Sequence, residues 1–443
     1  MTLQDPIAFI FSIILGKLVV ASKNFFNIWI TLISIIFIAY IDQSSLFVLF
    51  IGLLLLIYSR SGGDYRIIVS LCIIILAFFK TGLAVEVASL FNNQLFTKIL
   101  IGEMIEGRQI PSGISFYMLT VCLLSIQADR KTDVYKSFST AAFYPHILAG
   151  PVLHKPLEIN ERLTLAGPGY ASIVFSLGMF LLNSSEILHQ IFEATKISEA
   201  ANGYVRAWLF YLYLFANFFG YSLLATAYAM LFGVEIPINF NASTLAANPS
   251  EFWLRWHRSL SLLFRNYLYK WLLRHKVDAA ISIIFVLALS GVWHGWGWGY
   301  IIWGVVNGVL IILSRLISNG KILHAATFIL MPASWVPFFS ADLSQVKNYY
   351  LDFMLPYFPT DLISIKYFSV IIIIFVISCI PYKNLLSPIL VIKMYEKDPY
   401  GSHLPRFDSG IKESIVSLTG GAFLALVLYY GIGTASEFMY QRF

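Results

Sequence analysis

The stretch 279-AAISIIFVLALSGVWHGWGWGYIIWGVVNGVLIILS-314 contains 36 residues without an Asp, Glu, Lys or Arg. As a single α-helix it would be about 54 Å long, which exceeds a hydrocarbon core of about 30 Å. Its middle, 291–299, has four glycines in nine residues, and glycine weakens a helix. The pattern predicts two membrane-spanning helices that join or bend here, leaving His294 at or near membrane depth.

The composition of the whole chain is that of a membrane protein. Of 443 residues, 58% are apolar and only 12% are charged, about half the charged share of a soluble domain. An ordinary soluble enzyme, a disordered chain and a disulfide scaffold are therefore excluded. Because unpaired backbone groups cannot face lipid, we expect helices rather than strands. The fold class is thus an all-α polytopic membrane protein with roughly 11–12 transmembrane helices. The charge-free stretches behind this prediction are 24–41, 43–59, 67–79, 163–185, 207–234, 279–314, 367–382 and 414–436, with weaker candidates at 6–22, 113–128 and 322–341.

The distribution of charge predicts the orientation of the spans. Alternating spans place the basic loops on one side, which the positive-inside rule assigns to the cytoplasm, and the acidic loops on the other. All of these loops fall on their assigned sides only if the segment 141–151 does not cross the membrane. This segment contains Pro145, Gly150 and Pro151, which suits a re-entrant or interfacial element. The basic loops are 60–66, 130–136, 155–162, 251–276 and 383–412; the acidic ones are 86–106, 186–199 and 342–366.

A second informative stretch is 251-EFWLRWHRSLSLLFRNYLYKW-271. Its aromatic and apolar residues recur at steps of three and four, as on one face of a helix. Asn248-Pro249-Ser250 supplies a start signal with Ser250 as the N-cap. We therefore expect one basic, aromatic helix at the cytoplasmic boundary. The cations along the rest of this helix are Arg255, Arg258, Arg265, Lys270 and Arg274.

Two histidines are candidates for chemistry. An ionisable group within a bilayer is costly and usually faces a cavity or a partner. Burial disfavours the imidazolium form, so His294 would stay neutral and able to accept a proton. The alternative for His294 is a structural hydrogen bond between helices, and for His257 an amphipathic boundary residue. The nearby arginines fit a phosphate-bearing substrate or anionic lipid headgroups.

Other signals limit the reaction class. The chain has no Gly-rich phosphate loop, no zinc motif and no Gly-x-Ser-x-Gly elbow. This favours direct transfer assisted by a base over a covalent enzyme intermediate. We expect no metal, and the excess of 30 basic over 24 acidic residues is too thinly spread for nucleic-acid binding. His146 and His154 could line a cavity, but a turn position explains them equally well. His189, His324 and His403 lie near expected span ends, and the short spacing of His275 and Asp278 is not that of a His-to-Asp acyltransferase motif.

Five passages, in this order, resemble the membrane-bound O-acyltransferase family, in the branch of the alginate O-acetyltransferase membrane subunit and the lipoteichoic acid D-alanyl transferase. Together they cover about 110–310, the motif-bearing core of a single membrane-embedded domain expected over 1–443. The passages are 111-PSGISFY-117; 143-FYP-145 with 149-AGP-151; 219-FGYS-222 with 237-PINF-240; 251-EFWLRWH-257 with 265-RNYL-268; and 291-GVWHG-295 with Trp303-Gly304.

The resemblance implies helices around a central tunnel, with His294 catalytic and His257 the second important histidine. It implies a multi-pass protein of the bacterial cytoplasmic membrane with no bound cofactor. The donor would be a cytoplasmic acyl thioester, either acetyl-coenzyme A or the phosphopantetheine of an acyl carrier protein. The acceptor would be a hydroxyl of an envelope polysaccharide or relay protein, with an extracytoplasmic transferase- or esterase-like partner.

We predict that Arg255, Arg258, Arg265 and Lys270 steer the donor's phosphates. Trp293, Trp296 and Trp298 would exclude water. The other predicted substrate-binding residues are Trp256, Tyr221 and Asn239.

Two alternatives remain: D-alanyl transfer to teichoic acid from a carrier protein, and a transporter or flippase for a lipid-linked sugar. The chain departs from the family pattern at Leu223, Asn307, Gln127 and Asp129, and its segment between His257 and His294 is short. These differences concern the acceptor and partner more than the reaction class.

Overall fold

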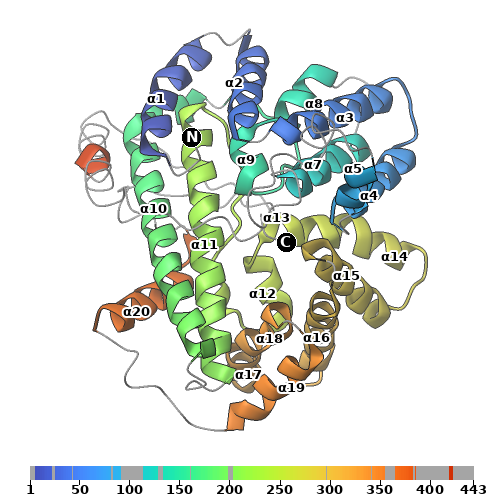
Figure 1. Cartoon of the computed structure of the whole chain (residues 1–443), viewed down its shortest axis with the longest axis vertical. Helices are drawn as coiled ribbons and strands as arrows, with labels where there is room; N and C mark the ends of the chain where they lie inside the picture. Colours follow the sequence, from blue (N-terminus) through green and yellow to red (C-terminus); the bar gives the residue numbers. More distant parts are fainter. Residues whose placement is uncertain are drawn as a thin grey trace. The chain divides into compact units, whose positions relative to one another are not determined.

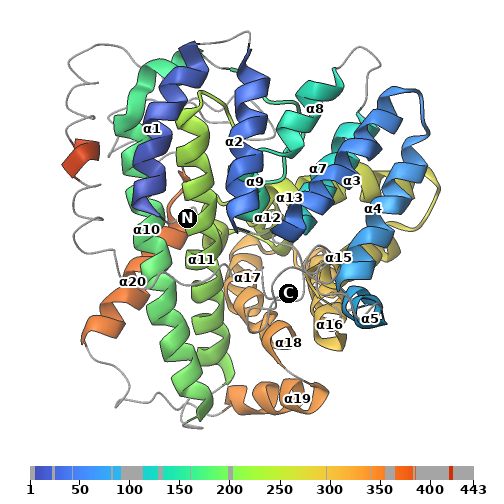
Figure 2. The ribbon, with the colours of Figure 1, turned by 45° about the horizontal axis from the view of Figure 1, so that its top comes forward.

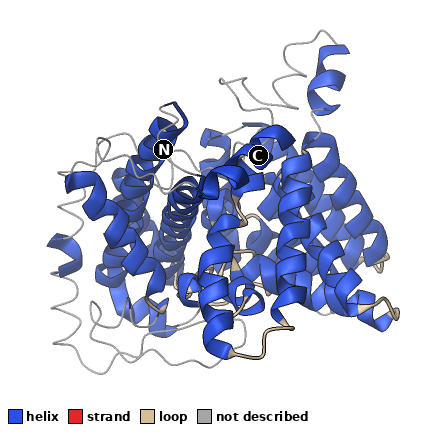
Figure 3. Cartoon of the chain, turned by 90° about the horizontal axis from the view of Figure 1, so that it is seen from below, coloured by secondary structure: helices blue, strands red, loops and turns tan. Residues whose placement is uncertain are grey.

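A computed structural model of the chain consists of helices joined by loops throughout the described residues (Figure 3). The all-α prediction is therefore confirmed for this part of the chain. The predicted span 414–436 lies outside it except for 419–422, and Trp296 lies outside it as well. The described residues are 5–21, 25–41, 43–80, 83–90, 113–127, 133–159, 161–197, 203–295, 297–340, 342–354, 365–382, 385 and 419–422.

The chain divides into two compact units, each considered by itself. The first contains the described residues of Met1–Met179, Gly220–Ile238 and Ser387–Phe443. The second contains those of Phe180–Phe219 and Asn239–Leu386. Helices α10 (Glu161–Ile197) and α11 (Gly203–Leu231) each contribute residues to both units (Figure 1). The other helices of the first unit are α1 (Pro6–Ala21), α2 (Phe26–Ile41), α3 (Gln43–Arg60), α4 (Tyr65–Lys80), α5 (Leu83–Leu90), α7 (Ile114–Ile126), α8 (Val134–Ala141) and α9 (Tyr144–Ala149).

Close approach of helices in the first unit depends on a small residue. The Tyr117 hydroxyl of α7 donates a hydrogen bond to the Leu49 carbonyl of α3 over 2.8 Å. A Cβ on Gly52, one turn further along α3, would overlap the Tyr117 ring.

Helix α9 lies in the segment 141–151, which we expect not to cross the membrane, and has six residues. At about 9 Å it is too short to span a bilayer.

Several described helices have the length and composition of membrane spans. Three are long and apolar enough to cross a bilayer: Pro168–Thr195, Gly203–Leu231 and Gly320–Phe339. Shorter apolar helices include Ala279–His294 and Trp298–Ser314. The helices of the second unit, besides its parts of α10 and α11, are α12 (Pro249–Arg255), α13 (Arg258–Leu263), a π-helix (Phe264–Tyr269), α14 (Lys270–Arg274), α15 (Ala279–His294), α16 (Trp298–Ser314), α17 (Gly320–Ala333), α18 (Val336–Phe339), α19 (Leu343–Leu351) and α20 (Ile365–Cys379).

Helices α15 and α16 form an antiparallel hairpin and lie side by side in Figures 1 and 2. Gly291 of α15 faces the Tyr300 carbonyl of α16, and Gly304 of α16 faces the Leu287 carbonyl of α15. At each position an added Cβ would overlap the facing carbonyl oxygen. Helix α15 is capped at its N-terminus by Asp278, whose carboxylate accepts hydrogen bonds from the backbone N–H groups of Ala280 and Ile281. The prediction of two helices joined within 291–299 is therefore confirmed.

The segment after Asn248 is not the continuous helix that its periodicity predicts. Helix α12 ends at Arg255, Trp256 is extended, and His257 has a φ of 43°, in the left-handed region. Helix α13 starts only after this break. The N-cap is Asn248 rather than Ser250, because the Asn248 side chain accepts a hydrogen bond from the backbone N–H of Glu251 over 2.8 Å. Apolar periodicity persists across a single left-handed residue, so the pattern alone does not reveal the break.

Candidate active site

His294 is the last residue of α15, at the turn toward α16. Only 3% of its surface is exposed. Aromatic rings enclose the imidazole, with centroids 4.7 Å away for Trp293, 5.3 Å for Trp303 and 5.3 Å for Phe338. The hairpin and the short helix α18 thus hold this side chain in an apolar environment.

His257 is positioned by its strained backbone and by the loop before α12. The Asn239 carbonyl accepts the backbone N–H of Arg258 over 3.0 Å. The Asn239 side-chain oxygen accepts the Ser259 hydroxyl over 2.7 Å and the Ser259 backbone N–H over 3.3 Å. The His257 ring is 2% exposed and packs edge-on against Phe218, with centroids 4.5 Å apart. A left-handed non-glycine residue persists only where its surroundings impose it, and such residues cluster at functional sites.

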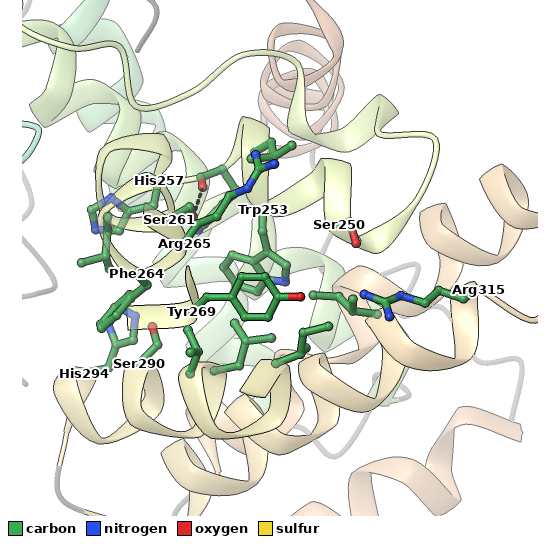
Figure 4. A pocket seen from close by; sticks show the side chains of 17 residues that line it. Ser250, Trp253, His257, Ser261, Phe264, Arg265, Tyr269, Ser290, His294 and Arg315 are labelled. Atoms are coloured by element: carbon green, nitrogen blue, oxygen red, sulfur yellow. Dashed lines mark hydrogen bonds between the residues drawn. The ribbon is translucent and has the colours of Figure 1, made fainter. Parts of the chain in front are cut away.

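Both histidines line one cavity of about 320 Å³, within the range of small-molecule sites. The Trp293 ring lies near both of them, with its centroid 6.2 Å from that of His257 and 4.7 Å from that of His294. Figure 4 shows the two imidazoles at the same end of the cavity, with Phe264 beside them. Residues 37 positions apart in the sequence are therefore brought to one space.

The cavity changes character along its length. At the histidine end the lining residues Trp256 and Leu260 are 1% and 4% exposed. Arg315 lies at the opposite end in Figure 4, and it and Arg265 are exposed lining residues. The cavity thus has a buried aromatic end with both histidines, and an opposite end, the mouth, at which the exposed Arg315 supplies the positive charge.

Among the four cations predicted to steer a phosphate, Arg265 lines the cavity. Arg258 and Lys270 are not among the lining residues. The Arg255 guanidinium is bound to the Glu251 carboxylate, four residues earlier on the same helix. Its sequence neighbour thus holds Arg255 at α12, and a direct role of Arg255, Arg258 or Lys270 in binding stays a prediction.

The aromatic and polar predictions divide in the same way. Trp256 lines the cavity and stacks on Phe252, with centroids 5.7 Å apart and planes at 14°. Trp298 is 74% exposed and is not a lining residue of the cavity, so its role in excluding water stays a prediction. Tyr221 belongs to the first unit. Its role as a substrate wall stays a prediction, as does that of Asn239, whose described side-chain bonds are to the turn after His257.

Sequence reasoning missed several lining residues, above all Tyr269, Ser290 and Arg315. Ser290 lies one helical turn before His294, so helical spacing could have identified it. Arg315 is the first charged residue after the charge-free run 279–314. Nothing in the local sequence indicates that Arg315 lies beside α12 and the π-helix, because that depends on how the hairpin packs.

Asn307, one of the departures from the family pattern, is fully buried in the hairpin. Its side-chain amide donates to the Trp303 carbonyl over 2.9 Å. Its side-chain oxygen accepts the Ser334 hydroxyl over 3.2 Å. In this chain the position therefore links α16 to the residue that follows α17.

Several bacterial proteins are similar to this chain over part of its length. A peptidoglycan O-acetyltransferase of Helicobacter pylori is 30% identical over 234 residues, 46% of this chain and 44% of the relative. A probable alginate O-acetylase of Pseudomonas syringae is 29% identical over 270 residues, 54% and 51% of the two chains. A teichoic acid D-alanyltransferase of Bacillus subtilis is 36% identical over 109 residues, 22% and 28% of the two chains.

The aligned regions span about half the length, or less, of the relatives that the chain matches. The profile of the membrane-bound O-acyltransferase family, MBOAT, matches residues 54–321, which is more than half of the chain. This range includes both histidines, the cavity and the hairpin. The chain is a multi-pass membrane protein and belongs to the membrane-bound O-acyltransferase family.

Proposed function

We propose that this protein transfers an acetyl group from a cytoplasmic thioester to a hydroxyl of an envelope polysaccharide, across the bacterial cytoplasmic membrane. The observation that carries the proposal is the cavity in which His257 and His294 share a buried end while the mouth is cationic. A thioester with a phosphate-bearing carrier has this same distribution: a neutral reactive end and an anionic end.

In the proposed reaction His294 is the general base. The neutral imidazole accepts the proton of the acceptor hydroxyl as its oxygen attacks the thioester carbonyl. The new C–O bond forms, the C–S bond breaks, and the proton passes to the departing thiolate, which leaves as a thiol. A positioned base of this kind typically contributes about 10²–10⁴ in rate. His257 orients the donor carbonyl from the same end of the cavity.

The aromatic enclosure supports this assignment. Rings of Trp293, Trp303 and Phe338 surround His294. Exclusion of water from this end protects the thioester from hydrolysis and strengthens polar interactions with the reacting atoms.

We favour transfer of an acetyl group over transfer of a D-alanyl group because the O-acetyltransferase relatives align with a larger share of this chain. The relatives named for O-acetyl transfer match about half of this chain, whereas the D-alanyltransferase matches 22%. In this proposal the polysaccharide hydroxyl is the direct acceptor, and an esterase-like partner outside the membrane would bring the polymer to the enzyme. Membership of an acyltransferase family disfavours the transporter alternative.

The test uses the full chain in nanodiscs with ¹⁴C-acetyl-coenzyme A and two acceptor probes, an oligomannuronate and a muropeptide. We expect His294→Ala to reduce label transfer by about 10²-fold or more, because the base is lost. His275→Ala is the matched control, since His275 is exposed and its ring nitrogen bonds to the Trp271 carbonyl of its own helix. Equal transfer by wild type and His294→Ala at equal protein levels would reject the assignment.

A further inference from the structure

We propose that Arg315 binds the 4′-phosphate of the thioester donor and that the cavity measures the pantetheine arm between this guanidinium and His294. This inference rests on the proposed function and deepens it, because it names the part of the donor that the mouth recognises. Arg315 is the C-cap residue of α16 and lies outside every passage of family likeness quoted above.

The charges around the cavity support an anionic ligand group. Two arginines, Arg265 and Arg315, line the cavity. Among the described residues that line it there is no Asp or Glu. The Tyr269 hydroxyl points toward the Arg315 end in Figure 4. A guanidinium offers a planar pair of N–H donors that fits phosphate oxygens, and such charge-assisted bonds are among the strongest in proteins.

The length of the cavity agrees with the donor. One face of α15 lines it from Ile283 through Val286 and Ser290 to His294, at helical spacing. The eleven residue-to-residue steps from Ile283 to His294 extend about 16 Å along an α-helix. The arm of phosphopantetheine has about thirteen bonds from the thioester sulfur to phosphorus, which span about 16 Å at the extension of a backbone chain.

The hairpin places Arg315 at the end of the cavity opposite His294. Gly308 of α16 packs against Ile284 near the start of α15, and Arg315 follows two turns later. The pKa of Asp278, the N-cap of α15, is held low chiefly by the backbone N–H groups of Ile281 and Ala280, and the Arg315 charge adds to this effect. Arg315 therefore lies beside the start of α15, beyond Ile283, and its guanidinium points back toward the cavity in Figure 4, while His294 lies at the other end of the helix.

The experiment compares two donors that differ only in the phosphate: acetyl-phosphopantetheine and acetyl-pantetheine. We expect Arg315→Gln to raise KM for the phosphorylated donor about tenfold or more, with kcat changed less than twofold. KM for acetyl-pantetheine should not change. Arg315→Lys should fall between wild type and Arg315→Gln, because it keeps the charge and loses the paired donors. Arg274→Gln is the matched control, since Arg274 is an exposed cation on α14 that does not line the cavity.

Assays in phosphatidylcholine nanodiscs and in phosphatidylglycerol nanodiscs separate the donor's phosphate from a lipid headgroup. An Arg315→Gln effect that is equal for both donors, or that occurs only with phosphatidylglycerol, would overturn the inference and leave the proposed function standing. Calorimetric binding of phosphopantetheine and pantetheine provides a readout without turnover. Arg315-dependent preference for phosphopantetheine in a protein that transfers no acetyl group would support the phosphate site and reject the proposed function.

Discussion

His294 and His257 are buried almost equally, at 3% and 2% exposure, yet the chain buries them by different means. His294 ends a regular helix, and its position follows from the close packing of α15 on α16 at small residues. His257 lies in a left-handed break between two short helices, and the two residues after it, Arg258 and Ser259, donate hydrogen bonds to Asn239. The position of His294 therefore depends on the close fit of two helices, whereas the position of His257 depends on hydrogen bonds made by the turn that follows it.

The largest effect is expected where the hairpin is closest. In Gly304→Leu the new side chain would overlap the Leu287 carbonyl, so the helices must separate. We expect a loss of about 3 kcal/mol of unfolding free energy, as for severe overpacking. The measurement is the fraction of detergent-solubilised protein that stays monodisperse after heating. Gly320→Leu is the control, because no atom lies within 4 Å of the corresponding Cβ; equal stability of the two variants would contradict the packing argument.

An intermediate effect is expected at the break. Asn239→Ala removes the oxygen that accepts both the Ser259 hydroxyl and the Ser259 N–H. We expect a loss of about 2 kcal/mol and a fall in kcat, because the His257 turn relaxes while α15 stays folded. Ser259→Ala removes one of these bonds and should cost about half as much. Hydrogen exchange would locate the change: loss of protection in α15 equal to that in α13 would show that the two regions are not independent.

The smallest effect is a pH dependence confined to the start of α15. The backbone N–H groups of Ile281 and Ala280 lower the pKa of the Asp278 carboxyl from its usual value. The carboxylate cap therefore stabilises the helix above the pKa of the unfolded chain and is lost as the pH falls through the folded pKa. We expect the first turn of α15 to lose amide protection under acid, and Asp278→Asn to abolish this dependence while capping equally well at neutral pH. Unchanged acid sensitivity in Asp278→Asn would assign the effect to another group.

The two regions also differ in how far they could be predicted. The hairpin follows from a charge-free run too long for one span and from its central glycines, which are local properties. The break at His257 is not local, because Asn239, 18 residues earlier, supplies the bonds that fix it. The Arg255 prediction was incomplete for a related reason: its Glu251 neighbour competes for the guanidinium.

The sequence by itself determined the helical membrane class and the hairpin, and it singled out His294 as the main candidate for chemistry; His257 was added by the family resemblance. Those properties depend on hydropathy, helix length and the identity of a few ionisable residues, all of which are read along the chain. Only the tertiary structure brought the two histidines to one end of a cavity and placed Arg315 at the other. The physical reason is that a cavity is enclosed by side chains from helices far apart in sequence, and their register is set by packing that no single segment encodes.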